Sequence, residues 1–345
     1  MGKRVLVTGL GTFWGGRVAQ ALEADPSVEV IVGLDRYEPT VQLERTEYVR
    51  SDESYSILAR IVKAARIDTI VHTFLVMDSS QMRSRSIHEI NVIGTMNLFA
   101  AASAPGSTVR NVVVKSSTLV YGTGPKDPVW FSEETRRTRP PRRMIERSVL
   151  EVEGYVRDFA VDNPHVSLAM LRFSNVLGPD ISTALSKALE LPLVPCLAGF
   201  DPRVQFVHET DVVRAVLHAL DHGIQGVYNV AGDGLLPWSE VAAICGRRTF
   251  PLPPFGMELL SGTLGRFGIE LPPELLDLLR YGRGADNRRL KRTGFEYQFT
   301  SASTVADFAE SLRLRRTIGS TAGDYQYERD VEQFFRHSPA VVRDD

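Results

Sequence analysis

The chain has 345 residues, of which 43% are hydrophobic and 24% are charged, and this balance excludes an intrinsically disordered protein. Its 40 Lys and Arg and 42 Asp and Glu residues leave a net charge of −2, which excludes a generally basic nucleic-acid-binding protein. Six of the basic residues are lysines, few enough to check one by one for a catalytic role: Lys3, Lys63, Lys115, Lys126, Lys187 and Lys291.

The first half of the chain alternates short apolar runs with amphipathic segments. The apolar runs are rich in Val and Ile and carry few charges, as strands buried on both faces of a sheet do. They lie at residues 4–7, 28–34, 47–49, 69–72, 111–115 and 166–172. Helical periodicity occurs between them, at residues 16–24, 55–65, 88–102 and 147–160. Strands that alternate with helices predict an α/β fold with a parallel, doubly wound sheet.

The pattern changes after Pro179, where prolines repeatedly interrupt the chain. Short helical segments are predicted between them and further on, at 274–281 and 306–312. This change predicts a smaller C-terminal lobe of the kind that selects a substrate. The predicted organisation is an α/β domain at 1–178 to which 203–232 returns, a lobe at 179–202 and 233–316, and a polar C-terminal tail at 317–345.

Targeting and metal-binding signals are not found in the sequence. No run reaches 18 apolar residues, so no membrane span is expected. The first strand begins at Arg4, which leaves no room for a signal peptide. The two cysteines, Cys196 and Cys245, have neither metal nor redox spacing, so no zinc site or disulfide framework is implied. These features predict a cytoplasmic protein.

A glycine-rich turn joins the first predicted strand to the first predicted helix. Free backbone N–H groups and the helix dipole make such a turn a binding site for a pyrophosphate. The residues predicted to contact a dinucleotide there are Gly9, Gly11, Thr12, Phe13, Trp14 and Gly15.

An acid ends the second predicted strand at Asp35, 20 residues after Gly15. An acid at this spacing binds the ribose 2′-hydroxyl of NAD and repels the 2′-phosphate of NADP, while the neighbouring Arg36 leaves room for NADP. The order of strand, turn, helix, strand and acid predicts a Rossmann-type fold that binds NAD. The alternative is a fold of this type that has lost its dinucleotide.

Further motifs follow in a fixed order along the chain. They are Asp52, His72, Asn91-Val92-Ile93-Gly94-Thr95, Ser116-Ser117-Thr118-Leu119-Val120-Tyr121-Gly122, Leu171-Arg172-Phe173-Ser174-Asn175-Val176-Leu177-Gly178-Pro179, Val207-His208-Glu209-Thr210-Asp211-Val212 and Gly226-Val227-Tyr228-Asn229-Val230. With this series the chain resembles the extended short-chain dehydrogenases, and among them the nucleotide-sugar epimerases and dehydratases of the UDP-glucose 4-epimerase type. The resemblance extends from about Lys3 to Leu312.

This resemblance implies roles for single residues. Asp52 would approach the adenine of the cofactor, Ser117 would take the catalytic serine position, and Asn175 would face the diphosphate of a nucleotide-linked sugar or related alcohol. The remaining residues implied at the cofactor are His72, Thr73, Phe74 and Asn91. Family members often pair through a four-helix interface, which here would use 88–102 and 147–160.

The glycine turn and the segment after the fourth strand depart from the family pattern. Thr12 stands at the middle glycine position, where its side chain must move aside or form a hydrogen bond of its own. Phe74 stands where the family usually has a small alanine and would narrow the cofactor groove.

The larger departure concerns catalysis. The family's general acid/base is a tyrosine with a lysine four residues later on the same helix face. Alignment places Ile145 and Val149 at these two positions, and no tyrosine anywhere in the chain is followed by a lysine at that spacing. The pair is therefore absent, whatever the alignment.

Two replacements for the missing pair can be weighed. Lys115 lies two residues before Ser117 on one strand, so both side chains share a face and Lys115 can supply an ammonium near the cofactor. The favoured alternative is a lysine that pairs with an acid at the strand end. Tyr121 or Tyr155 would supply the phenol, but neither stands at the expected place.

An arginine-rich segment at 136–147 replaces the usual entry to the catalytic helix. Guanidinium groups suit phosphates and carboxylates, so Arg143 is a candidate substrate ligand. A solvated loop beside Glu133, Glu134 and Glu146 explains the segment equally well. Arg203 is a second candidate, one position away from the family's substrate arginine, whose place is taken by Val204.

Two functions fit these features. The first is an NAD-dependent enzyme that acts on a nucleotide-linked sugar or a related secondary alcohol through an atypical active site. The second is a dinucleotide-binding sensor or scaffold without the usual chemistry. The missing pair favours the second, and the retained Ser117, Asn175 and substrate lobe favour the first.

Overall fold

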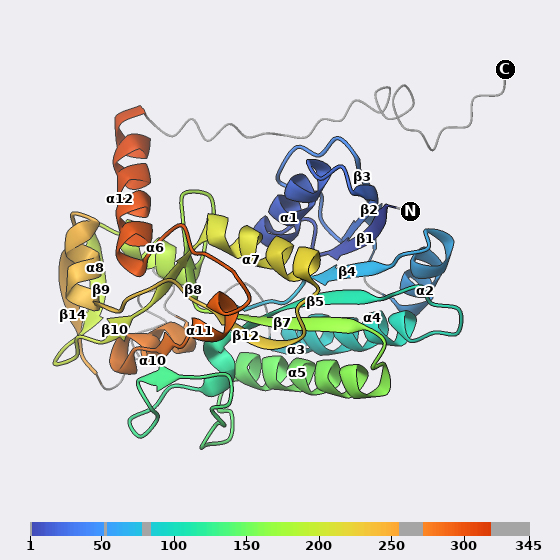
Figure 1. Ribbon diagram of the computed structural model, residues 1–345. Coiled ribbons are helices and arrows are strands. Elements are labelled where there is room, and N and C mark those ends of the chain that lie inside the picture. The colour runs from blue at the N-terminus through green and yellow to red at the C-terminus, as the bar shows by residue number, and fades with distance from the viewer. Residues whose placement is uncertain (1, 52–53, 78–83, 255–271, 319–345) are drawn as a thin grey trace.

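A parallel seven-stranded sheet forms the centre of the molecule (Figure 1). The computed structural model describes residues 2–51, 54–77, 84–254 and 272–318. The strands follow the order β12-β7-β5-β4-β1-β2-β3, and every neighbouring pair is parallel. Their bounds are β1 Lys3–Thr8, β2 Val28–Asp35, β3 Thr46–Arg50, β4 Thr69–His72, β5 Asn111–Ser117, β7 Ser167–Phe173 and β12 Gly226–Val230. The predicted doubly wound fold is confirmed.

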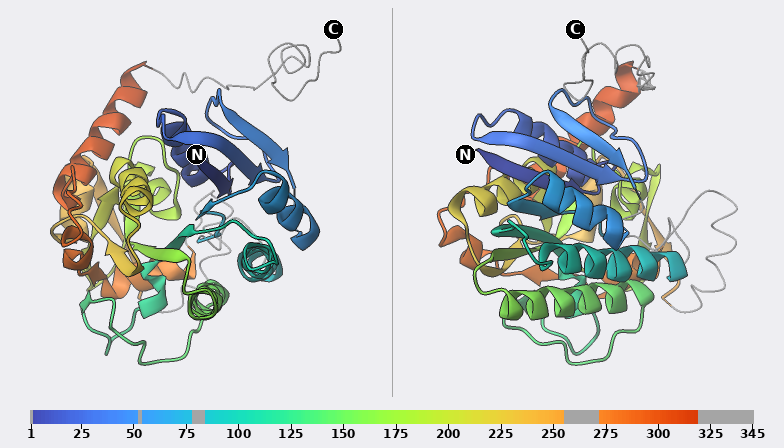
Figure 2. Two further views of the ribbon diagram at one scale, coloured as in Figure 1. Left: turned by 45° about the vertical axis from the view of Figure 1, so that its right-hand side comes forward. Right: turned by 90° about the vertical axis from the view of Figure 1, so that its right-hand side faces the viewer.

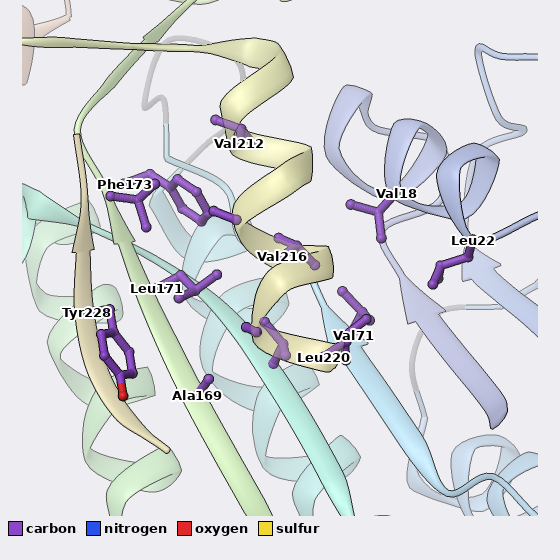
Figure 3. Close-up of a cluster of buried hydrophobic side chains, with 14 of the residues drawn as sticks. Val18, Leu22, Val71, Ala169, Leu171, Phe173, Val212, Val216, Leu220 and Tyr228 are labelled. Carbon is purple, nitrogen blue, oxygen red and sulfur yellow. The ribbon is translucent and has the colours of Figure 1, made fainter. Parts of the chain in front are cut away.

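Helices cover both faces of the sheet. Successive strand residues point to opposite faces, and both faces are apolar, so each is buried under a layer of helices. Val5 and Val7 of β1 pack under α1 and α7, whereas Leu6 packs under α2, α4 and α5. The helices are α1 Phe13–Glu23, α2 Tyr55–Ala64, α4 Gly94–Ala102, α5 Met144–Asp162 and α7 Glu209–His222. Figure 3 shows the first of these layers, in which Val18 and Leu22 of α1 and Val212, Val216 and Leu220 of α7 lie over the sheet.

The predicted helix 88–102 is divided by a π-helical turn. A short helix, α3 Ser84–His88, leads into the turn η1 Glu89–Ile93, and α4 begins at Gly94. The Gly94 N–H donates to the carbonyl of Glu89, one residue further back than in an α-helix. α4 and α5 run side by side along the sheet (Figure 2).

A second hydrophobic core lies in the C-terminal part of the chain, on the left in Figure 1. It is built around Trp238, Phe206 and Phe308. The short strands outside the central sheet pair as β8 with β11, β9 with β14, β10 with β13 and β6 with β15. Their bounds, with the remaining helices, are η2 Thr118–Tyr121, β6 Trp130–Phe131, β8 Asn175–Leu177, α6 Ala184–Glu190, β9 Leu193–Leu197, β10 Arg203–Val204, β11 Phe206–His208, β13 Leu236–Pro237, α8 Trp238–Ile244, β14 Arg248–Leu252, α10 Pro273–Tyr281, β15 Gly284–Ala285, α11 Arg288–Lys291 and α12 Ser301–Ile318.

Some predicted features lie near or beyond the ends of the described residue ranges. The predicted helix 306–312 lies inside α12, which ends at Ile318, and the predicted tail lies outside the described residues from residue 319 onward. Asp52 is also outside them. Among the helices that the structure describes, none is both long and apolar enough to span a bilayer.

Candidate functional site

A cavity of about 500 Å³ lies between the carboxyl ends of the sheet strands and the C-terminal lobe. This is the position at which doubly wound sheets bind ligands. Its lining residues are Gly11, Thr12, Phe13, Trp14, Asp35, Arg36, Tyr37, Phe74, Leu75, Val76, Met77, Ile90, Lys115, Ser116, Ser117, Thr118, Leu119, Phe173, Ser174, Asn175, Val176, Ile181, Ser182, Thr183, Ala184, Leu185, Pro272, Glu274, Leu275, Leu278 and Arg283.

The glycine turn brings the N-terminus of α1 to this cavity. Gly9 has a φ of +77°, which L side chains rarely adopt. A Cβ on Gly15 would lie 2.2 Å from the carbonyl oxygen of Gly9, so only glycine lets α1 approach the turn this closely. Thr12 is the N-cap of α1, and its Oγ1 donates to the Gly9 carbonyl at 2.7 Å and accepts from Gly15 N at 3.3 Å. Of the two possibilities for Thr12, the structure shows the hydrogen-bonded one.

Asp35 ends β2 beside this turn with only 2% of its surface exposed. It accepts hydrogen bonds from Gly11 N at 2.9 Å and from Tyr37 N at 3.0 Å. Burial raises the pKa of the Asp35 carboxyl, and the backbone donors oppose that rise. Arg36 and Tyr37 are exposed at the rim of the cavity, next to the carboxylate.

His72 lies behind the cavity wall, in a chain of buried hydrogen bonds. Its Nδ1 is 2.7 Å from Thr8 Oγ1, and its Nε2 is 2.9 Å from Thr95 Oγ1, which itself donates to the Asn91 carbonyl. Since the Thr95 hydrogen is used, Nε2 carries the ring proton in this arrangement. Burial, reinforced by the charge of Lys115, lowers the pKa of His72 to about 3, so the ring is neutral.

Thr73 and Asn91 support the wall and do not line the cavity. Thr73 Oγ1 donates to the Thr8 carbonyl at 2.7 Å. The Asn91 side chain accepts from Val76 N at 2.8 Å and donates to the Val76 carbonyl at 2.9 Å. The amide therefore fixes the segment 74–77, in which Phe74 lines the cavity itself.

Ser117, the residue predicted for the catalytic serine position, lines the cavity, whereas Ile145 and Val149, aligned with the family's pair, do not. Ser117 ends β5, and its Oγ accepts from Leu119 N at 3.2 Å. Ile145 and Val149 lie on the buried face of α5, where Val149 packs against Tyr121 and its neighbours. Within the described lining, Tyr37 is the one tyrosine and Lys115 the one lysine.

Lys115 is buried at 6% exposure, and the acidic partner expected from the sequence does not lie beside it among the described residues. Its Nζ donates to the Leu75 carbonyl at 3.1 Å and lies 4.3 Å from the centre of the Trp14 ring. Burial lowers the pKa of Lys115 to about 7.

The two tyrosines weighed as replacements lie elsewhere. The Tyr121 hydroxyl is buried between Asn229 Oδ1 at 2.7 Å and Arg172 Nη1 at 2.9 Å. Burial raises its pKa. Tyr155 is exposed on α5 and belongs to another part of the surface.

The lobe side of the cavity includes Asn175 and Arg283. Asn175 Nδ2 donates to the Gln205 carbonyl at 2.9 Å. The other two substrate candidates do not line the cavity: Arg203 is exposed on β10, and Arg143 caps α5 and pairs with Asp277 at 3.7 Å.

Arg283 was not predicted from the sequence. It is 7% exposed, its Nη2 donates to Thr123 Oγ1, and its Nε has no hydrogen-bond partner among the described residues. Burial lowers the pKa of Arg283 to about 10, which keeps it charged at neutral pH. An arginine between two glycines, at 282 and 284, follows no periodic pattern that would have revealed it.

Known proteins resemble the chain over most of its length. Residues 5–231 match the NAD dependent epimerase/dehydratase family. An uncharacterized protein of Mycobacterium tuberculosis is 34% identical over 324 residues, which cover 92% of this chain and 86% of that protein. A dTDP-4-dehydro-6-deoxy-D-allose reductase of Streptomyces sp is 27% identical over 317 residues, covering 83% of this chain and 91% of the enzyme.

A solved structure shares the fold. It is the UDP-glucuronic acid 4-epimerase from Bacillus cereus in complex with UDP-glucuronic acid and NAD. The TM-score is 0.68 at 17% identity, and the match covers 90% of this chain and 99% of that one.

Proposed function

The chain belongs to the NAD-dependent epimerase/dehydratase family, and from this premise we propose that its cavity binds NAD together with a nucleotide-linked sugar or a related secondary alcohol. One observation carries the proposal: the N-terminus of α1 and the Asp35 carboxylate open on the same cavity. This is the pairing of groups that a dinucleotide needs for its pyrophosphate and its ribose.

The residues at the sheet end of the cavity fit NAD. Gly11 to Trp14 would hold the pyrophosphate against the free N–H groups of α1, and Asp35 would accept a hydrogen bond from the ribose 2′-hydroxyl. Asp35 disfavours a 2′-phosphate, whereas Arg36 at the rim would attract one, so NADP is the second candidate. His72, Thr73 and Asn91 would act indirectly, by fixing the wall next to the cofactor.

The substrate would occupy the lobe end, between Asn175 and Arg283. The charged guanidinium of Arg283 lines the cavity and suits a phosphate or another anionic group. The reductase relative and the epimerase structure both carry nucleotide-linked sugars in their names, which supports this class of substrate. Arg143 would support the site through Asp277 of α10, the helix that also carries Leu275 and Leu278 of the lining.

The active site of this proposal is atypical, since neither Ile145 nor Val149 can transfer a proton. A dinucleotide-binding sensor or scaffold is the second candidate function, and the packing of Val149 into the core favours it. Retention of Ser117, Asn175 and a charged Arg283 in one cavity favours the enzyme.

The division of the chain and its assembly are part of the proposal. We place the dinucleotide-binding domain at 1–178 with 203–232, and the substrate lobe at 179–202 and 233–316. Pairing through α4 and α5 would cover Met96 and Tyr155, which are exposed there, and light scattering of the purified protein measures it. A cytoplasmic location completes the proposal.

Replacement of Asp35 by asparagine tests the cofactor. We expect Asp35→Asn to weaken NAD binding about 10-fold, because a charged hydrogen bond to the ribose is lost. The preference for NAD over NADP should narrow, because the repulsion of the 2′-phosphate also disappears. Calorimetric titration with both dinucleotides measures the two effects.

The control for this variant is Glu38→Gln, which removes an exposed carboxylate three residues further along the chain. It should bind both dinucleotides as the wild type does. A wild type that binds neither dinucleotide would refute the cofactor proposal, and an Asp35→Asn variant with unchanged affinities would refute the role of Asp35.

A further inference from the structure

Lys115 and Ser117 present their side chains to the same cavity from one strand. They are two residues apart on β5, so they share a face of the sheet, and both line the cavity. The other titratable residues of the described lining are the buried Asp35, Arg36 and Tyr37 at the rim, and Glu274 and Arg283 in the lobe. Of the titratable residues in this described lining, Lys115 is the one that shares β5 with Ser117.

The surroundings of Lys115 do not satisfy all the hydrogen-bond donors of its Nζ. The segment after β4 supplies one acceptor, the Leu75 carbonyl, and α1 supplies the face of the Trp14 ring. An ammonium group has three hydrogens to donate, and one is accounted for by Leu75. From β4, His72 is the titratable neighbour, and it is neutral. No carboxylate of the described residues forms a salt bridge with Nζ.

Burial without a counter-ion disfavours the charged form of a lysine. The pKa of Lys115 falls from its ordinary value of 10.5 to about 7, and burial is the cause. At neutral pH a large share of the molecules would therefore hold a neutral amine with a free lone pair. Such a group has the pKa that general acid–base catalysis favours.

We propose that Lys115 Nζ accepts and returns the hydroxyl proton of the alcohol bound in the cavity, in place of the family's tyrosine. The inference rests on the proposed function. Bound NAD⁺, which Gly11 to Trp14 and Asp35 would hold, would supply the hydride acceptor. The carbinol hydrogen would leave with its electron pair, the O–H electron pair would become the second C–O bond of a ketone, and the hydroxyl proton would pass to the amine. Ser117 Oγ accepts from Leu119 N, so its own hydrogen remains available to the substrate oxygen.

A titration of the lysines tests the proposal without any substrate. In protein labelled with ¹³C-lysine, the Cε signals are followed by NMR from about pH 5 to about pH 11. Lys115→Arg identifies the signal by its loss. We expect a midpoint near 7 for Lys115, and a change of this signal when NAD is added. A midpoint near the ordinary value of about 10.4 would overturn the proposal.

Two substitutions separate proton transfer from a fixed charge. Lys115→Met lacks the amine, and Lys115→Arg keeps the charge but does not release its proton. NAD binding is measured by calorimetry, and single-turnover reduction of NAD by UDP-glucose, UDP-glucuronic acid or dTDP-glucose is followed by absorbance. We expect both variants to bind NAD but to lose the reduction step by about 100-fold or more. Lys63→Met, an exposed lysine on α2, is the control and should react as the wild type does.

The outcomes distinguish NAD binding, on which the proposed function depends, from proton transfer by Lys115. Wild-type protein that fails to bind NAD would refute the proposed function. Normal binding with normal reduction in Lys115→Met, or full reduction in Lys115→Arg, would refute the proton-transfer role alone. When none of the three sugars is oxidised by the wild type, the titration decides: a midpoint near 7 supports the role and a midpoint near 10.4 removes it.

Discussion

We expect Glu153→Leu to lower the free energy of unfolding by about 3–5 kcal/mol, because it leaves a buried guanidinium without its counter-ion. Glu153 of α5 and Arg172 of β7 are 1% and 7% exposed. Arg172 Nε lies 2.8 Å from Glu153 Oε1, and Nη2 lies 2.5 Å from Oε2. Although burial opposes it, the bonds and charge of Glu153 raise the pKa of Arg172, so the guanidinium stays charged.

The same pair holds the strand end that carries the candidate catalytic residues. Ser116 Oγ donates to Glu153 Oε1 at 2.6 Å, and Arg172 Nη1 donates to the Tyr121 hydroxyl. Loss of Glu153 should therefore also disturb Ser117, the next residue of β5.

Urea denaturation, analysed with the slope held to its wild-type value, measures the effect. Arg157→Ala is the matched control, because Arg157 donates to the same carboxylate from an exposed position and should cost at most about 1 kcal/mol. The double variant Glu153→Leu with Arg172→Met should recover most of the loss, since no unpaired charge remains. A loss below about 1 kcal/mol in Glu153→Leu would contradict the account.

The fold was predictable because its signals are local. Apolar runs of Val and Ile separated by helical periodicity specify buried parallel strands, and six of the seven strands of the sheet fall where these runs lie. Asp35 reaches the cavity for a related reason: a residue at the carboxyl end of a parallel strand lies at the edge where the loops meet. The spacing from Gly15 was enough to indicate it.

The direction of side chains and the positions of charges were less predictable. His72 also ends a strand, but its ring turns between Thr8 and Thr95 and lies behind the cavity wall. An acid for Lys115 was expected from the usual pairing of strand-end lysines, yet its neighbours are a carbonyl and an indole. Arg283 comes from a segment far along the chain, and only the packing of the lobe brings it to the cavity. These contacts depend on tertiary structure, which no local pattern encodes.

We expect Gly15→Ala to lower the affinity for NAD about 100-fold, equivalent to about 2.7 kcal/mol. The backbone of Gly15 is helical, so alanine meets no conformational strain there. Its Cβ would lie 2.2 Å from the Gly9 carbonyl oxygen and 2.8 Å from Leu10 N. Both are backbone atoms, so relief requires α1 to move away from the turn, and the N–H groups that would hold the pyrophosphate move with it. Overpacking of this kind should also cost roughly 1–3 kcal/mol of stability.

Gly154→Ala is the matched control, because it makes the same substitution inside α5. A Cβ on Gly154 meets nothing within 4 Å, so alanine should stabilise the helix by about 0.5–1 kcal/mol and leave NAD binding unchanged. Calorimetric NAD titrations and thermal unfolding of the two variants make the comparison. A Gly15→Ala variant that binds NAD like the wild type would show that the close approach of α1 to the turn is not what forms the pyrophosphate site.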